Sequence, residues 1–182
     1  ILKKIEFIKK LKILARLSHR KITEGRENLK LEYDVSLDNF NKKLSEKELK
    51  ELFIDNLIAK RDREIKRGYT VIGPHRDDLI LKLNEMDLRK YGSQGQQRTA
   101  ALALKLAELE FMKSETGEYP VLLLDDVFSE LDGLRRKALI NIIADKIQTI
   151  ITATDGENLS GIKNSSYNVY QVEKGRIKKR VN

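Results

Sequence analysis

Two short segments of this sequence combine residue types that can handle a phosphorylated ligand. The first is the glycine-rich turn at 92–98, Gly-Ser-Gln-Gly-Gln-Gln-Arg, which precedes an Ala- and Leu-rich helical pattern. Amides at a helix start lack intrahelical partners and lie at the positive end of the helix dipole, and Gly95 lets the backbone approach closely. This turn therefore suits a phosphate group.

The second segment is the apolar run 121–124, which ends in Asp125 and Asp126. Four apolar residues between turn signals predict a strand buried on both faces, as in a parallel sheet. A carboxylate at the carboxyl end of such a strand can hold Mg²⁺ directly or through water, which is the role expected for Asp125. The next carboxylate, Asp126, can position or polarise the water that attacks in phosphoryl transfer.

Each segment alone has a simpler explanation, because a glycine-rich helix start is often only a cap and paired Asp residues often belong to a solvated loop. Their order is more specific. A helix of about four turns separates them, and Ser-Glu-Leu-Asp at 129–132 follows the second. The three features together predict a site for a nucleoside triphosphate.

The elements that must position these segments follow from hydrophobic spacing and turn residues, and they predict an α/β protein. Helices are expected at 1–22, 45–68, 99–113 and 134–146, strands at 29–37, 69–72, 121–124 and 148–152, hairpins at 79–91 and 167–179, and loops at 73–78 and 161–166. Ser45 with Glu48 forms a capping box, and Gly68 closes that helix.

The first helix is expected to be amphipathic, with a basic outer face. Its apolar stripe is Ile1, Ile5, Ile8, Leu11, Ala15 and Ser18, and the candidate DNA-binding residues opposite are Lys3, Lys4, Lys9, Lys10, Lys12, Arg16 and Arg20. The net charge of +8 comes from 36 basic and 28 acidic residues and is concentrated at the two ends. A basic patch attracts nucleic acid by releasing counterions from phosphates, and the alternative is a solvated helix face.

Composition excludes several classes of protein. Without Cys, the chain has no disulfide framework and no thiolate metal site. No apolar run approaches the ~20 residues that a membrane span requires. We therefore expect a cytoplasmic protein with no membrane partner.

With these segments in view, the sequence resembles the ABC-type ATPases. Residues 93–97 are similar to their signature motif, 121–126 to their Walker B strand and 129–132 to their D-loop. Within that class, four segments are similar in sequence to bacterial recombination-repair proteins of the SMC and Rad50 type. These segments are 73–78, 91–99, 105–108 and 122–132.

The resemblance implies a fold as well as a function. It implies the C-terminal part of a P-loop (ABC-type) ATPase head with an α-helical lobe segment. Residues 1–68 would form the helical lobe segment with one strand, and 69–182 the C-terminal half of the head. The function implied is ATP-dependent DNA binding in recombinational repair, at junctions of single- and double-stranded DNA and with mediator proteins that help load a recombinase.

The resemblance also implies roles for single residues, in a head-to-tail homodimer that binds ATP and Mg²⁺. The turn would contact the γ-phosphate of the ATP held by the other subunit, through Ser93, Gln94, Gly95 and Gln96. Asp125 would hold Mg²⁺ through water, Asp126 would be the catalytic carboxylate, and Asp132 would reach across the dimer.

Three departures from the family pattern limit the expected activity. No P-loop of the form G-x-x-x-x-G-K-[ST] occurs, and the first residue is Ile1, so we expect a piece of a longer protein that is inactive alone. Asp126 stands where most relatives carry Glu, which predicts slow hydrolysis in the whole protein. In place of the switch His, the sequence offers Thr152 or Thr154.

Two other functions fit parts of the sequence. A Rad50- or SMC-type head needs long heptad segments before the signature, and residues 1–67 are too short and interrupted for them. A stand-alone DNA- or protein-binding module would use only the basic ends, and its binding would weaken steeply with salt.

Structural roles are expected for the remaining ring side chains. His75 is expected to be hydrogen-bonded in a turn after Pro74, and His19 to be a solvated position on the first helix. Tyr167 and Tyr170 are expected to be buried by the final hairpin rather than offered to bases.

Overall fold

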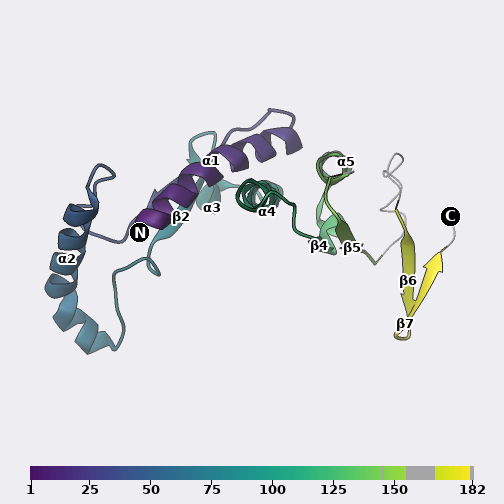
Figure 1. The fold of residues 1–182 in the computed structure, drawn as a ribbon. Helices are drawn as coiled ribbons and strands as arrows, with labels where there is room; N and C mark the ends of the chain where they lie inside the picture. The colour runs from purple at the N-terminus through teal and green to yellow at the C-terminus, as the bar shows by residue number, and fades with distance from the viewer. Residues whose placement is uncertain (145, 155–166, 181–182) are drawn as a thin grey trace. The chain divides into compact units, whose positions relative to one another are not determined.

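The computed structural model describes residues 1–144, 146–154 and 167–180. The chain forms two compact units, Ile1–Glu118 and Tyr119–Asn182, and each has its own helices and strands (Figure 1). The loop expected at 161–166 lies outside the described residues. Within the described ranges, no helix is long and apolar enough to cross a membrane.

In the first unit, helix α1, Leu2–Ile22, packs against α4, Gln94–Thr116 (Figure 1). The expected apolar stripe is confirmed along most of the helix, where Ile8, Leu11, Ala15, Ser18 and Ile22 are buried. Phe7 of α1 packs edge to face on Phe111 of α4, with ring centroids 4.7 Å apart. Burial of this apolar area holds the two helices together.

A small antiparallel sheet of order β1-β2-β3 covers the same unit. Strand β1 is Leu29–Asp34, β2 is Asp78–Leu83 and β3 is Met86–Asp87, with Leu31 opposite Leu81. The expected alternation of buried and exposed side chains is confirmed at the start of β1, since Leu29 and Leu31 are buried while Lys30 is exposed. Strand β1 precedes position 68, where the lobe segment is expected to end, whereas β2 and β3 follow it. The sheet therefore contains strands from both of the expected segments.

The second strand expected in the hairpin at 79–91 is wrong for most of its length. Residues Leu88–Tyr91 form the short helix α3. The side chain of Asp87 caps it by accepting a hydrogen bond from the Lys90 amide at 3.1 Å. A local cap therefore outweighs the apolar alternation of these residues.

Helix α2, Glu46–Arg67, has the expected ends. Ser45 and Glu48 form a capping box, and Gly68 ends the helix at a φ of 72°. The strand expected at 69–72 is wrong. Ile72 instead joins a small core with Leu37 and Leu49.

The loop at 73–78 is fixed to the end of β1 by polar contacts. Asp77 accepts hydrogen bonds from the Ser36 amide at 2.8 Å and from the Tyr33 hydroxyl. The Ser36 hydroxyl bridges the amide and the carbonyl of Gly73, both at 3.0 Å. Gly73 has a φ of 123°, a conformation that other residues rarely adopt.

The second unit contains a parallel pair of strands, β4 at Leu122–Asp125 and β5 at Thr149–Thr152. A short 3₁₀ helix, Val127–Glu130, follows β4, and α5, Gly133–Ile143, connects to β5. The parallel pairing expected from the apolar run is confirmed. The expectation that this run is buried on both faces is wrong, because Leu124 is buried whereas Leu123 is 70% exposed. Ile150, the register partner of Leu123 on β5, is 56% exposed as well, so the face of the sheet that carries these two residues is open to solvent.

The final hairpin is confirmed, with β6 at Val169–Glu173 and β7 at Arg176–Arg180. Lys174 and Gly175 both have positive φ angles, as a two-residue hairpin turn requires. The expectation for its tyrosines is wrong, because Tyr167 is 39% and Tyr170 56% exposed. A hairpin of two strands has no second layer to cover these rings.

Candidate functional site

The glycine-rich turn is the first turn of helix α4 rather than a loop before it. Ser93 is the N-cap and forms a reciprocal capping box with Gln96. The Ser93 amide donates to Gln96 Oε1 at 2.9 Å, and the Gln96 amide donates to Ser93 Oγ at 3.3 Å. Both side chains are thus occupied in the cap, and the amides of Gln94 and Gly95 remain for an anion at this helix start.

Space above Gly95 is open. A Cβ placed on this glycine would meet no atom within 4 Å, apart from its chain neighbours and the backbone of its own helix. Packing in this chain therefore does not require glycine at this position. Close approach of a ligand to the backbone would account for it.

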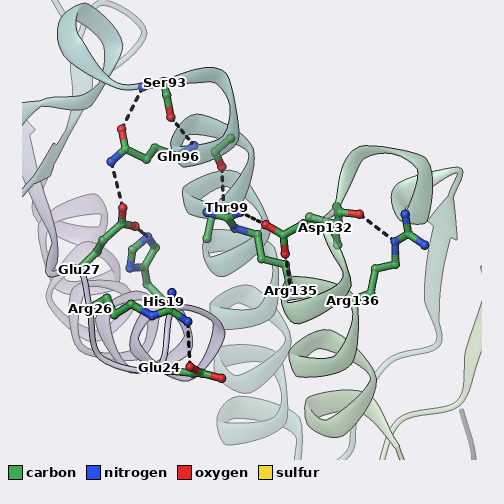
Figure 2. A network of polar contacts seen from close by, with 12 residues as sticks. His19, Glu24, Arg26, Glu27, Ser93, Gln96, Thr99, Asp132, Arg135 and Arg136 are labelled. Carbon is green, nitrogen blue, oxygen red and sulfur yellow. Dashed lines mark hydrogen bonds and ion pairs between the residues drawn. The ribbon is translucent and has the colours of Figure 1, made fainter. Parts of the chain in front are cut away.

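A chain of polar contacts links the turn to α1, as Figure 2 shows. Gln96 Nε2 donates to Glu27 Oε1 at 2.9 Å, and Glu27 Oε2 lies 3.7 Å from His19 Nε2. His19 is fully buried, so its expected role as a solvated position is wrong. It lies four residues after Ala15 and three before Ile22, which places it on the buried stripe.

The acidic strand end is held by the neighbouring strand. Asp125 and Thr152 are paired across β4 and β5, and the Thr152 hydroxyl donates to Asp125 Oδ1. The Asp126 amide lies 3.2 Å from both the carbonyl and the hydroxyl oxygen of Thr152. Of the two threonines expected to replace the switch His, Thr152 is the one in contact with the acidic pair.

Asp126 adopts a backbone conformation that is rare for residues other than glycine. Its φ of 48° lies in the left-handed region, where Asn and Asp are the side chains best tolerated. Ser129 Oγ donates to Asp126 Oδ2 at 2.9 Å and lies 2.8 Å from its carbonyl oxygen. The Asp126 side chain is solvent-exposed and oriented by this serine. Strained backbone of this kind is frequent at functional sites.

The donor set of the strand end fits a magnesium ion. Two exposed carboxylates and a threonine hydroxyl are hard oxygen groups, and Mg²⁺ in phosphoryl-transfer sites usually takes one or two carboxylates plus water and phosphate oxygens. No group of three or more acidic, His or Cys side chains that could enclose a metal occurs in the described part of the chain. The residues therefore fit an ion shared with a nucleotide better than an ion held by protein alone.

Asp132 caps helix α5. Its carboxylate accepts a hydrogen bond from the Arg135 amide at 2.9 Å and pairs with the Arg135 guanidinium. The amide hydrogen bond and the nearby guanidinium lower the pKa of Asp132, so it stays ionised at neutral pH. These contacts account for a structural role, and the expected contact across a dimer stays a prediction.

The basic residues expected to bind DNA are divided among several environments. Lys12 and Arg16 line a hollow of about 680 Å³ between α1 and β1, together with Lys30 and Lys42. Burial, followed by the charge of Lys42, lowers the pKa of Lys12.

Two members of the basic set are engaged within the protein instead. Lys4 donates to the Pro74 carbonyl, and Lys10 pairs with Glu115 at 2.7 Å. Lys3, Lys9 and Arg20 are exposed on α1. The structure thus gathers Lys12 and Arg16 at one hollow and does not bring the whole set together.

Sequence reasoning names Ser129 only as part of the segment 129–132, without a role toward Asp126, and offers Thr152 only as one of two alternatives. It misses Glu27. The parallel register of β4 and β5 could have identified Thr152, since the carboxyl ends of paired parallel strands lie together. The sequence held no signal for Glu27, whose contacts come from tertiary packing.

Solved structures share this fold. A chain described as the recombination mediator protein RecF with ATP, in the RecFOR pathway, superposes with a TM-score of 0.77 at 32% identity, over 97% of this chain and 45% of that one. A structure from a study of ATP-driven dimerization in SMC ATPases superposes with a TM-score of 0.57 at 13% identity, over 97% of this chain and 85% of that one, which shows likeness of fold alone. The fold is that of the C-terminal part of an ABC-type ATPase head with an α-helical lobe segment.

Curated proteins match this sequence over most of its length. No family model matches the chain. It is 61% identical over 177 residues to the DNA replication and repair protein RecF of Halothermothrix orenii, covering 96% of this chain and 46% of that protein. It is 48% identical to RecF of Natranaerobius thermophilus, over 98% of this chain and 48% of the relative. The chain matches the C-terminal part of RecF and spans about half the length of these curated relatives.

Proposed function

We propose that this chain is part of an ATP-dependent DNA-binding protein of the RecF type, called the whole protein below. In this proposal it supplies the signature turn, the Walker B strand end and the D-loop to a homodimer that ATP drives together. The whole protein would act in the cytoplasm on gapped DNA with RecO and RecR, and would help to load RecA at junctions of single and double strands. The relatives named RecF support the DNA-repair role.

The observation that carries the proposal is that Thr152 is hydrogen-bonded to both members of the acidic pair, Asp125 and Asp126. The Thr152 hydroxyl holds the Asp125 carboxylate, while the same residue accepts from the Asp126 amide. Asp125 is thereby oriented as a ligand for Mg²⁺, which when bound would neutralise charge on the phosphates of ATP. Asp126, oriented by Ser129, would accept a hydrogen bond from the attacking water.

The other half of the site would be the start of α4. The open space at Gly95 and the amides at the head of this helix would receive the γ-phosphate of ATP held by the second subunit. Ser93 and Gln96 would act chiefly by fixing this helix start, since their side chains complete the capping box. A P-loop, which this sequence lacks, would come from the remainder of the whole protein.

Size-exclusion chromatography of the whole protein tests this proposal. With ATP and Mg²⁺ we expect the wild type to elute as a dimer, and Asp125→Asn to remain monomeric. Asp62→Asn, an exposed change on α2 with the same loss of charge, should behave as wild type. A wild-type protein that never dimerises with ATP would overturn the proposal.

A second function, a nucleic-acid-binding module without ATPase activity, is favoured by the hollow at Lys12 and Arg16. Four cations line it, and Glu32 and Asp34 line it as well. Gel-shift titrations at two salt concentrations decide this point. Binding that is independent of ATP and weakens steeply with salt would support the module, because released counterions drive such binding.

A further inference from the structure

A second basic hollow lies on the first unit, and no residue of the signature turn or of α1 lines it. It has a volume of about 190 Å³ and lies where the last turns of α2 meet the segment after Gly68. The residues that line it are Lys60, Arg63, Arg67, Tyr69, Val71 and Arg76. The sequence prediction did not single it out, because its cations come from two separate segments.

Two of the three arginines of this hollow, Arg67 and Arg76, contact neutral groups. Arg76 Nε donates to the Thr70 carbonyl at 3.1 Å, and its guanidinium lies 4.8 Å from the centroid of the Tyr69 ring. Arg67 reaches only the Tyr69 hydroxyl, at 3.5 Å. Among the described residues, none of Arg63, Arg67 and Arg76 pairs with a carboxylate.

Nearby carboxylates are already engaged. Asp38 pairs with Lys60 at 2.7 Å, and Glu64 accepts the Val71 amide at 2.7 Å. No acidic residue lines the hollow, so its lining carries an excess of positive charge. Such an arrangement favours an anionic ligand from outside the chain.

The geometry favours one phosphate group over a whole nucleotide. Arg63 and Arg67 are four residues apart on α2 and so lie on the same face. Arg76 is oriented by its ring and carbonyl contacts, which leaves its terminal amino groups for a bidentate contact. A volume of about 190 Å³ is smaller than the ~300–1,000 Å³ of most small-molecule sites.

We propose that this hollow binds one backbone phosphate of DNA, as a contact separate from the basic face of α1. The inference rests on the DNA-binding function proposed above and locates one of the contacts with DNA. Backbone phosphates lie at regular intervals along a strand, so a single-phosphate hollow can anchor DNA without reading its sequence. The site uses no residue of the nucleotide-binding turn or the acidic strand end.

Fluorescence anisotropy of the whole protein with a labelled DNA that has both single- and double-stranded parts tests the site. We expect the double variant Arg63→Glu and Arg67→Glu to weaken binding at least about tenfold and to reduce the slope of affinity against salt by about one, the value for one lost phosphate contact. Arg61→Glu with Lys66→Glu is the matched control, since it makes the same charge change on exposed positions of the same helix outside the hollow. This control should bind within about threefold of wild type.

Other outcomes overturn the inference in distinguishable ways. A hollow variant that binds no worse than the control removes this site and leaves the proposed function standing. A wild-type protein that binds no DNA removes both. A hollow variant that binds DNA as well as the control does, but binds inorganic phosphate or polyglutamate more weakly than the control, would assign the hollow to a free anion or an acidic protein segment instead. The milder change of Arg63 and Arg67 to Gln should give the same direction, and its melting temperature confirms folding.

Discussion

Thr152 and Asp125 are register partners at the carboxyl ends of two parallel strands, and the Thr152 hydroxyl donates a hydrogen bond to the Asp125 carboxylate. That hydroxyl also lies 3.2 Å from the Asp126 amide. One neutral side chain thus orients both acidic residues. A threonine there can fix the position of a carboxylate, but it does not carry the charge that a protonated His would bring to a phosphate.

Replacing Thr152 with Val removes the hydroxyl while keeping the shape of the side chain. We expect ATP hydrolysis by the whole protein to fall roughly tenfold, because a lost hydrogen bond to a charged group is worth about 1.5–3 kcal/mol. Steady-state phosphate release measures this. Thr154→Val is the control and should stay within about twofold, and an equal loss in both variants would contradict the role of Thr152.

Asp126→Asn tests the catalytic carboxylate without disturbing the backbone, because Asn also tolerates the left-handed conformation found there. We expect ATP hydrolysis by the whole protein to fall by about 10²–10⁴-fold, as removal of a general base does. Dimerisation with ATP should persist, because Asp125 is intact. Hydrolysis within about threefold of wild type would exclude Asp126 as the base.

Asp77 links the stability of the first unit to pH. Burial alone would raise the pKa of Asp77, but hydrogen bonds from the Ser36 amide and the Tyr33 hydroxyl outweigh it and lower the pKa below its ordinary value of 3.8. The ionised form therefore stabilises the fold above pH 3.8, and this stabilisation is lost as the pH falls through the lower folded-state value.

The variant Asp77→Asn isolates this contribution. Urea unfolding should show wild type more stable than Asp77→Asn at neutral pH, with the difference shrinking as the pH is lowered into the acid range. Asp55→Asn, an exposed change on α2, should show no such trend. A difference that grows on acidification would contradict the assigned sign.

His19 tests the buried link between α1 and the signature turn. Its side chain is fully buried, so His19→Ala should lower the free energy of unfolding by about 2–4 kcal/mol through the cavity it leaves. Lys21→Ala, exposed on the same helix, should change it by less than about 0.5 kcal/mol. Denaturant titration compares the two variants, and equal effects would show that His19 is not part of the core.

Local signals in the sequence predicted much of the fold. The apolar stripe of α1, the capping box of Ser45 and the turn at Gly175 each depend on residues close together in the chain, and each is confirmed. The parallel pair β4 and β5 is also confirmed, because a short apolar run between turn signals is distinctive. Of these elements, β4 and β5 place the acidic strand end of the candidate site.

The remaining features depend on contacts that local patterns do not contain. Residues 69–72 have strand-like composition, yet Val71 bonds to a side chain of α2 and Ile72 enters a core with Leu37. Glu27 joins Gln96 to His19 across elements far apart in sequence. The sequence pattern likewise does not predict the left-handed backbone of Asp126, because Asp is common in many conformations.

Mixing two inactive variants of the whole protein tests the central claim, that a nucleotide site is shared between the turn of one subunit and the acidic strand end of the other. Gly95→Asp places a negative charge at the helix start, where an added Cβ meets no atom within 4 Å, and Asp126→Asn removes the base. Each variant alone should hydrolyse little ATP. In an equal mixture, about half of the dimers hold one intact composite site, so activity should rise toward about a quarter of wild type. Activity that stays at the mean of the two variants would contradict the shared site.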